Sequence, residues 1–186
     1  MNAFVRAPLA ISNLKITMPT ADPTGKADSQ IRIWTDGACI GNPGPGGWAF
    51  VAQRLVDGEV IKDVDVSGSE PFETTNNRME MQAVIEALKI IPRNETAPIT
   101  ITSDSQIVIN GMTKWLPSWI KNGWKNAKRE PVANRDLWDQ ILELSHGLNI
   151  TWVWIKGHAG NAQNERVDGL AEDAARAAVV ASFTAE

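Results

Sequence analysis

The chain of 186 residues has little cysteine and histidine, with one Cys (Cys39) and two His (His146 and His158). One cysteine excludes an internal disulfide framework and a multi-cysteine zinc site. Two histidines exclude a histidine-rich metal site. No apolar run approaches the roughly 20 residues that a helix needs to span a bilayer, so we expect no membrane protein. The formal net charge of −4 excludes a uniformly basic nucleic-acid-binding protein but allows a local basic patch.

The composition is that of one globular domain, since 43% of the residues are hydrophobic and 22% are charged. We expect a domain over residues 31–181, a mobile tail over 1–30 and a short C-terminal tail over 182–186. The first tail shows no helical or strand period, and three prolines interrupt it. Its first 20 residues carry two basic and no acidic side chains, which leaves an organelle transit peptide open as an alternative. A second alternative is that translation starts at Met18.

The first half of the domain has the patterning of strands. Residues 31–40 are apolar and β-branched, 48–56 form a second apolar run, and 60–66 alternate with period two. Composition predicts turns over 41–47 and at Asp57-Gly58. Three strands joined by short turns predict an antiparallel meander.

The period then changes to that of helices. Met81, Val84, Ile85 and Leu88 recur at helical spacing and predict a helix over 78–91. The remaining elements that we expect are strands over 99–103 and 150–155, helices over 134–146 and 165–181, a short helix or turn over 104–111 and an irregular helical stretch over 112–131. The alternation of strands and helices favours parallel pairing beside the meander, and therefore an α/β fold.

Four acids stand out because they lie on or beside apolar elements. Asp36 interrupts an apolar strand, although aspartate is depleted in strands. Glu80 lies at the margin of the buried helix face, Asp104 follows a strand, and Asp168 lies in what we expect to be the first turn of the last helix. Each also has an ordinary explanation. Asp36 could face water at a strand end, Asp104 could cap a helix, and helix dipoles favour acids in first turns.

Together the four acids predict more than each does alone. Ligand sites in open sheets form at the carboxyl ends of strands, where this fold could gather the carboxylates. Four clustered carboxylates need cations to stay ionised, and oxygen ligands select Mg²⁺ or Mn²⁺. Two such ions can support phosphodiester cleavage. His158, in a glycine-bearing loop, could carry protons at neutral pH, or it could be a solvated loop residue.

Residues 111–135 form a basic, tryptophan-rich segment in an acidic chain. They carry six basic residues and one acid, a net charge of +5. Basic side chains meet phosphates and flat aromatic rings stack on bases, so nucleic acid is the simplest partner. Trp115 and Trp119 are also spaced to pack together on a helix, which leaves a structural role open.

Short motifs follow one another along the chain: Thr35-Asp36-Gly37, residues 41–47 (Gly-Asn-Pro-Gly-Pro-Gly-Gly), 74–80 (Thr-Thr-Asn-Asn-Arg-Met-Glu), 103–106 (Ser-Asp-Ser-Gln), 115–125 with three tryptophans, and 156–168 with Gly-His-Ala-Gly and Asn-Glu-Arg-Val-Asp. Over residues 31–178 they resemble type 1 ribonuclease H in family order, and they are closest to the bacterial form with a basic protrusion. The resemblance implies a five-stranded mixed sheet flanked by helices. It also implies an endonuclease that hydrolyses the RNA strand of RNA/DNA hybrids with two metal ions, leaving 5′-phosphate and 3′-hydroxyl ends.

The resemblance assigns roles to single positions. It implies Asp36, Glu80, Asp104 and Asp168 as catalytic ligands of Mg²⁺, with Mn²⁺ as a possible substitute, and His158 as a catalytic residue in proton transfer. The implied substrate-binding residues are Cys39, Asn42, Thr75, Asn76, Asn77, Gln106, Trp115, Trp119, Lys121, Lys125 and Lys128. The expected partner is an RNA/DNA hybrid, and we expect no obligate protein partner. We also expect the protein to be a cytoplasmic monomer.

The chain departs from the family pattern in three places. Asn122, Asn126 and Glu130 stand where a more basic run is typical, Gly169 follows Asp168 inside the expected helix, and residues 1–30 match nothing in the family. Two rival interpretations stay open. One is the same fold used as a reverse-transcriptase or integrase-type domain, and the other is a catalytically silent module that binds hybrids.

Overall fold

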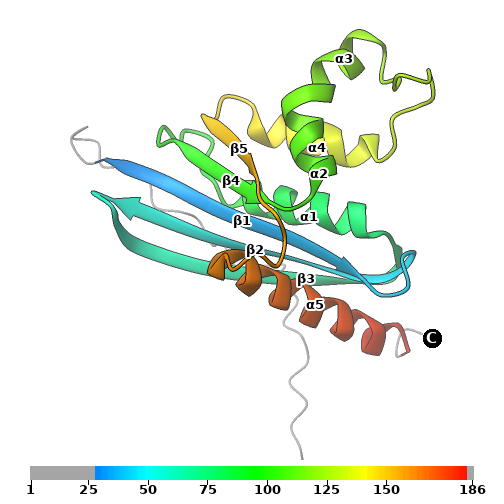
Figure 1. The fold of residues 1–186 in the computed structure, drawn as a ribbon, viewed down its shortest axis with the longest axis horizontal. Helices are drawn as coiled ribbons and strands as arrows, with labels where there is room; N and C mark the ends of the chain where they lie inside the picture. The colour runs from blue at the N-terminus through cyan, green and yellow to red at the C-terminus, as the bar shows by residue number, and fades with distance from the viewer. Residues whose placement is uncertain (1–27, 184–186) are drawn as a thin grey trace, which may run out of the picture.

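The computed structural model describes residues 28–183, which contain a single five-stranded sheet (Figure 1). Its strands are β1 (Ser29–Cys39), β2 (Gly44–Val56), β3 (Glu59–Thr74), β4 (Ile99–Ser103) and β5 (Ile150–Trp154). The order across the sheet is β3-β2-β1-β4-β5. β1, β2 and β3 pair antiparallel, whereas β4 pairs parallel with both β1 and β5. The predicted meander with two parallel strands beside it is confirmed. The predicted N-terminal tail lies almost wholly outside the described residues.

The meander strands are longer than the sequence pattern predicts. β2 begins at Gly44 rather than at residue 48, because residues of the expected turn continue the strand. Gly47 faces α5 (Ala162–Ser182) so closely that a Cβ there would lie 2.3 Å from the backbone nitrogen of Ala175. β3 extends to Thr74 rather than to residue 66, since it keeps pairing with β2 beyond its apolar alternation.

The helices follow the predicted order with shifted ends. They are α1 (Asn76–Lys89), α2 (Gln106–Asn110), a π-helical turn η1 (Gly111–Trp115), α3 (Leu116–Lys121), α4 (Arg135–Ser145) and α5. The irregular helical stretch expected over 112–131 ends at Lys121 and continues as turns. α5 begins at Ala162, where the Asn161 side chain accepts a hydrogen bond from the backbone nitrogen of Asn164 and caps the helix. Asp168 is therefore in the second turn of α5, not in the first.

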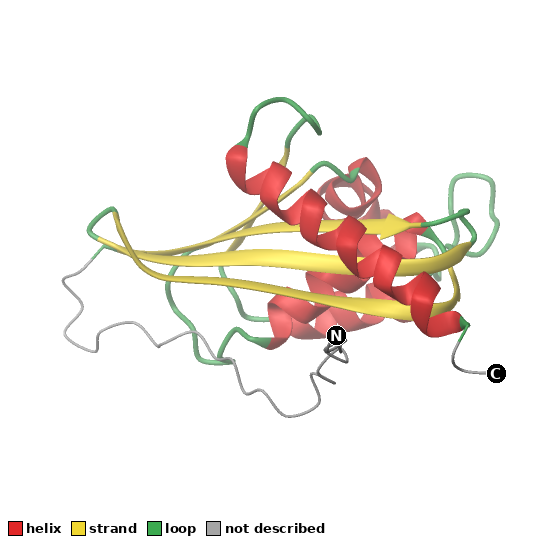
Figure 2. Cartoon of the chain, turned by 90° about the horizontal axis from the view of Figure 1, so that it is seen from below, coloured by secondary structure: helices red, strands yellow, loops and turns green. Residues whose placement is uncertain are grey.

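Helices cover both faces of the sheet (Figures 1 and 2). α1 packs on one face with α4 behind it, and α5 crosses the other face over β1, β2 and β3. The larger core lies under α1 and α4 and includes Ile31, Ile33, Phe50, Ile85 and Trp138. The core under α5 is built from smaller residues: Ala49, Val51, Val167 and Ala171. Small side chains allow α5 to approach the sheet closely, which brings its carboxylates toward β1.

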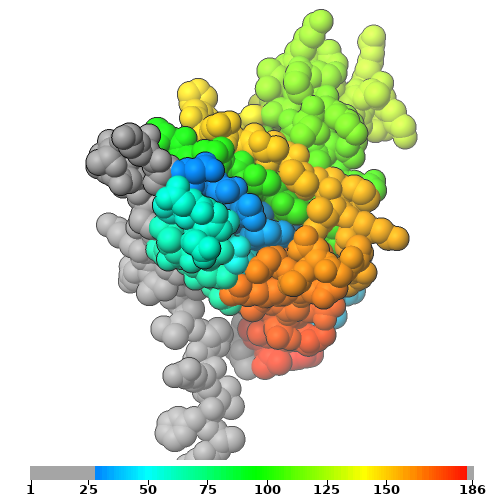
Figure 3. Space-filling model, turned by 60° about the vertical axis from the view of Figure 1, so that its left-hand side comes forward, coloured from blue at the N-terminus to red at the C-terminus, as the bar shows by residue number. Residues whose placement is uncertain are grey.

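The segment that follows β4 leaves the body of the domain. Residues 111–131 project from it as a protrusion, coloured yellow-green in Figures 1 and 3. Within residues 28–183, no helix is both long and apolar enough to cross a membrane.

Candidate active site

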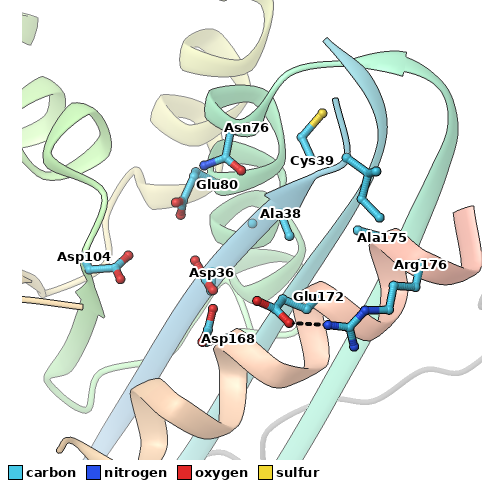
Figure 4. Close-up of a pocket in the computed structure, with 12 residues that line it drawn as sticks. Asp36, Ala38, Cys39, Asn76, Glu80, Asp104, Asp168, Glu172, Ala175 and Arg176 are labelled. Atoms are coloured by element: carbon cyan, nitrogen blue, oxygen red, sulfur yellow. Dashed lines mark hydrogen bonds and ion pairs between the residues drawn. The ribbon is translucent and has the colours of Figure 1, made fainter. Parts of the chain in front are cut away.

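The four acidic residues singled out from the sequence come from four different elements and point toward one pocket (Figure 4). Asp36 is on β1, Glu80 on α1, Asp168 on α5, and Asp104 directly follows β4. β1 and β4 are adjacent and parallel, so Asp36 and Asp104 lie toward the same edge of the sheet. α1 lies directly on β1, because a Cβ on Gly37 would be 2.2 Å from the backbone nitrogen of Glu80. The packing of these elements brings the carboxylates together.

Three of these carboxylates form a tight group. Asp36, Glu80 and Asp104 each offer an oxygen, and these oxygens all lie within 4.8 Å of one another. Asp36 and Glu80 are buried, with 7% and 6% of their surfaces exposed. Asp168, on α5, points toward Asp36 in the same pocket (Figure 4). The position of Asp104 excludes the helix-cap alternative, since Ser105 caps α2.

The pocket is electrostatically unfavourable for so many acids. Burial, together with the negative charges of Asp104 and Asp168, raises the pKa of Asp36 to about 8. Burial also raises the pKa of Glu80 well above its usual value, with smaller contributions from the other three acids. The Glu80 Oε2 atom is buried without a hydrogen-bond partner among the described residues. A buried, unpartnered carboxylate oxygen in an all-carboxylate donor set fits a hard divalent cation such as Mg²⁺ or Mn²⁺.

His158 lies at the rim of this pocket in the loop between β5 and α5. Its side chain is 78% exposed, and Nδ1 is 3.6 Å from Asp168 Oδ2. Its backbone has a φ of 52°, in the left-handed region. An exposed imidazole beside a site carboxylate can exchange protons with solvent.

The candidate substrate-binding residues between positions 39 and 77 line the pocket or lie next to residues that line it. Cys39 and Asn76 line it, and the Cys39 Sγ donates to the carbonyl oxygens of Gly44 and Thr74. Asn42 Oδ1 accepts a hydrogen bond of 3.0 Å from the backbone nitrogen of Asn76.

Thr75 is the N-cap of α1 and accepts from the backbone nitrogen of Arg78. Asn77 is exposed on the first turn of α1, and Gln106 is exposed at the start of α2. The Arg78 guanidinium forms an ion pair with Asp136 on α4, at 2.8 Å.

The pocket is also lined by two residues that were not predicted from the sequence. Glu172 and Arg176 lie one and two helical turns after Asp168 on α5, and Arg176 Nη2 is 2.6 Å from Glu172 Oε2 (Figure 4). The spacing of four residues from Asp168 was the available signal, because such residues share one helix face.

The protrusion carries the remaining candidates away from the carboxylates. The ring of Trp119 lies 5.4 Å from that of the buried Trp138, and it also contacts Trp115 and Trp124. Trp119 therefore ties the protrusion to the core, whereas Trp115 is 38% exposed. Lys121, Lys125 and Lys128 are exposed. Lys125 and Arg129 also line a second pocket in the loop that follows α3.

Comparison with known proteins identifies the family. The RNase H family model matches residues 28–176. A ribonuclease H of Paracoccus denitrificans is 52% identical over 139 residues, which are 74% of this chain and 87% of that protein. A ribonuclease H of Pelobacter propionicus is 47% identical over 155 residues, which are 83% and 90% of the two chains.

Solved structures show the same fold. LC9-RNase H1, a type 1 RNase H with the type 2 active-site motif, is 34% identical with a TM-score of 0.70, over 86% of this chain and 74% of that one. LC11-RNase H1, solved in complex with an RNA/DNA hybrid, is 24% identical with a TM-score of 0.59, over 80% of this chain and 99% of that one. The chain therefore belongs to the RNase H family as a type 1 member, which makes it an endoribonuclease.

Proposed function

We propose that this chain hydrolyses the RNA strand of RNA/DNA hybrids with two divalent cations, Mg²⁺ or in its place Mn²⁺, and leaves 5′-phosphate and 3′-hydroxyl ends. One observation carries the proposal: four carboxylates from four elements surround one pocket, and one of them is buried without a partner. Relatives about half identical to this chain are ribonucleases H, and LC11-RNase H1, which has the same fold, binds an RNA/DNA hybrid.

The proposed ligands of the cations are Asp36, Glu80, Asp104 and Asp168. When bound there, two divalent cations would activate the attacking water and stabilise the leaving oxygen. Burial fixes the Asp36 and Glu80 side chains, so their oxygens are preorganised for the cations. The half-buried Asp104, which follows β4, and the half-buried Asp168 on α5 would complete the site.

His158 is proposed to move a proton between the site and solvent. Its imidazole is exposed and lies next to Asp168, so it can reach both bulk water and a group bound in the pocket. An imidazole can act as a general acid or a general base, which suits this role.

The substrate-binding residues are proposed in three groups. Cys39, Asn42, Asn76 and Gln106 would lie in the substrate groove near the pocket, some of them near the RNA 2′-hydroxyls that distinguish RNA from DNA. Thr75 and Asn77 would lie near the DNA strand. Trp115, Trp119 and the three protrusion lysines would bind the hybrid away from the cleavage site, with Trp119 acting mainly through packing. The expected monomeric state and cytoplasmic location stay predictions.

The test is cleavage of an end-labelled RNA/DNA hybrid in millimolar Mg²⁺, beside matched RNA/RNA and DNA/DNA duplexes and an EDTA control. We expect internal cleavage of the hybrid's RNA strand alone, and its loss in EDTA. Asp36→Asn should abolish cleavage but keep hybrid binding. The matched control is Asp57→Asn at the hairpin tip, an exposed position whose left-handed φ of 51° suits asparagine. Hybrid binding by the wild type without cleavage would instead support the silent binding module.

A further inference from the structure

Asp104 is held in place by the last residue of β5 and the three residues after it, 154–157, which we name the β5 bracket. Trp154 Nε1 donates a hydrogen bond of 3.0 Å to the main-chain oxygen of Asp104. The backbone nitrogen of Ile155 donates to the oxygen of Ser103 at 3.1 Å. Two successive carbonyl groups at the end of β4 are therefore tied to two successive residues at the end of β5.

The bracket also contacts the Asp104 carboxylate itself. A Cβ built on Gly157 would lie 2.4 Å from Asp104 Oδ2, nearer than non-bonded atoms approach. The backbone of Gly157 is outside the left-handed region, so its conformation does not require glycine. What requires glycine here is the carboxylate of Asp104, which occupies the space of a side chain.

We propose that Gly157 and Trp154 are positioning residues that hold the Asp104 carboxylate against Asp36 and Glu80. The glycine leaves the space that the carboxylate fills, and the indole fixes the backbone from which that carboxylate projects. This inference rests on the proposed function, because it assigns to Asp104 the role of a cation ligand. It also couples the ligand to the loop of His158, which directly follows Gly157.

Packing of the hydrophobic core does not account for these two positions. Trp154 is 46% exposed and stands outside both core clusters. α5 provides a contrast at Gly169, next to Asp168, where a Cβ would meet nothing within 4 Å. The two glycines each neighbour a site residue, but only one of them is in contact with a carboxylate.

The test compares Gly157→Ala and Trp154→Phe with Gly169→Ala as the matched control. The readout is the dissociation constant for Mn²⁺ without nucleic acid, measured by electron paramagnetic resonance of the free ion. Loss of groups that orient a metal ligand typically weakens metal binding by 10- to 100-fold. We expect about a tenfold weakening in Gly157→Ala, a smaller weakening in Trp154→Phe, and no change in Gly169→Ala. Urea unfolding of each apoprotein checks that the fold is intact.

The outcomes separate this inference from the proposed function. Wild-type Mn²⁺ affinity in Gly157→Ala overturns the inference, even if cleavage falls, because the histidine loop rather than the carboxylate has then moved. If Gly157→Ala does not fold, Trp154→Phe decides, and an unchanged Mn²⁺ affinity in that variant overturns the role of the bracket. A wild type that binds Mn²⁺ without cleaving any hybrid refutes the proposed function and leaves the positioning test intact.

Discussion

Without metal, the carboxylate pocket should lower the free energy of unfolding at alkaline pH, and Asp36→Asn should remove much of this loss of stability. The Asp36 carboxyl releases its proton near pH 3.8 in the unfolded chain but near pH 8 in the folded one. Between these values the unfolded chain binds fewer protons, so the free energy of unfolding falls as the pH rises. Above about pH 8 the full loss remains, because both states are then ionised.

The size of the effect follows from the raised pKa. Each pKa unit corresponds to about 1.4 kcal/mol, so the change to about 8 sets an upper limit of about 6 kcal/mol. Relaxation and water entry lower the cost of a buried charge, and we expect about 3 kcal/mol. Asparagine has nearly the same shape as aspartate and no charge. In EDTA, the Asp36→Asn variant should therefore be more stable than the wild type by about 3 kcal/mol near pH 9, with the difference vanishing toward acid pH.

Urea unfolding followed by tryptophan fluorescence measures this difference across the pH range. Mg²⁺ provides a second arm of the assay, since a ligand that binds only the folded state stabilises it by about 2.7 kcal/mol at 100 times its dissociation constant. Mg²⁺ should stabilise the wild type and have little effect on the variant. Equal unfolding free energies for the two proteins near pH 9 in EDTA would refute the idea that burial of clustered charge governs this pocket.

Four further substitutions test three other parts of the structure. His158→Ala should lower kcat by about 10²-fold with little change in Mn²⁺ affinity, and complete loss of activity would show that the imidazole does more than transfer a proton. Trp119→Ala should lower the free energy of unfolding by about 3 kcal/mol and Trp115→Ala by far less, so equal losses in urea unfolding would contradict the anchoring role of Trp119. Arg54 and Glu95 form a buried ion pair. Glu95→Gln leaves the Arg54 guanidinium buried without its counter-ion and should lower the free energy of unfolding by about 3 to 5 kcal/mol in the same assay. Wild-type stability in this variant would show that the ion pair is dispensable.

The sequence predicted the elements best where local signals agreed. The strand expected over 99–103 matches β4 residue for residue, because a β-branched run is bounded by Pro98 and Asp104. Local signals failed for β3, whose second half contains Gly68, Pro71 and several polar residues. That half forms a strand only because β2 offers it a pairing edge, which no local pattern reveals.

The site was predicted as a set rather than residue by residue. For Asp104 and Asp168, an ordinary role at a helix start was a sound explanation from the local sequence. The structure removes both explanations, because Ser105 caps α2 and Asn161 caps α5 ahead of Asp168. Glu172 and Arg176 were missed because their relevance depends on which face of α5 turns toward β1.

By itself, the sequence determined the α/β class, the order of its elements and the kinds of residue available for chemistry, since periodicity and residue type are local properties of the chain. Only the tertiary structure decided which of these residues meet. Parallel pairing of β1 with β4, and the close seating of α1 and α5 on opposite faces of the sheet, bring acids from positions 36, 80, 104 and 168 to one pocket. Burial in that pocket then raises the pKa of Asp36 and Glu80, because low polarity and like charge act only between groups that folding has placed together.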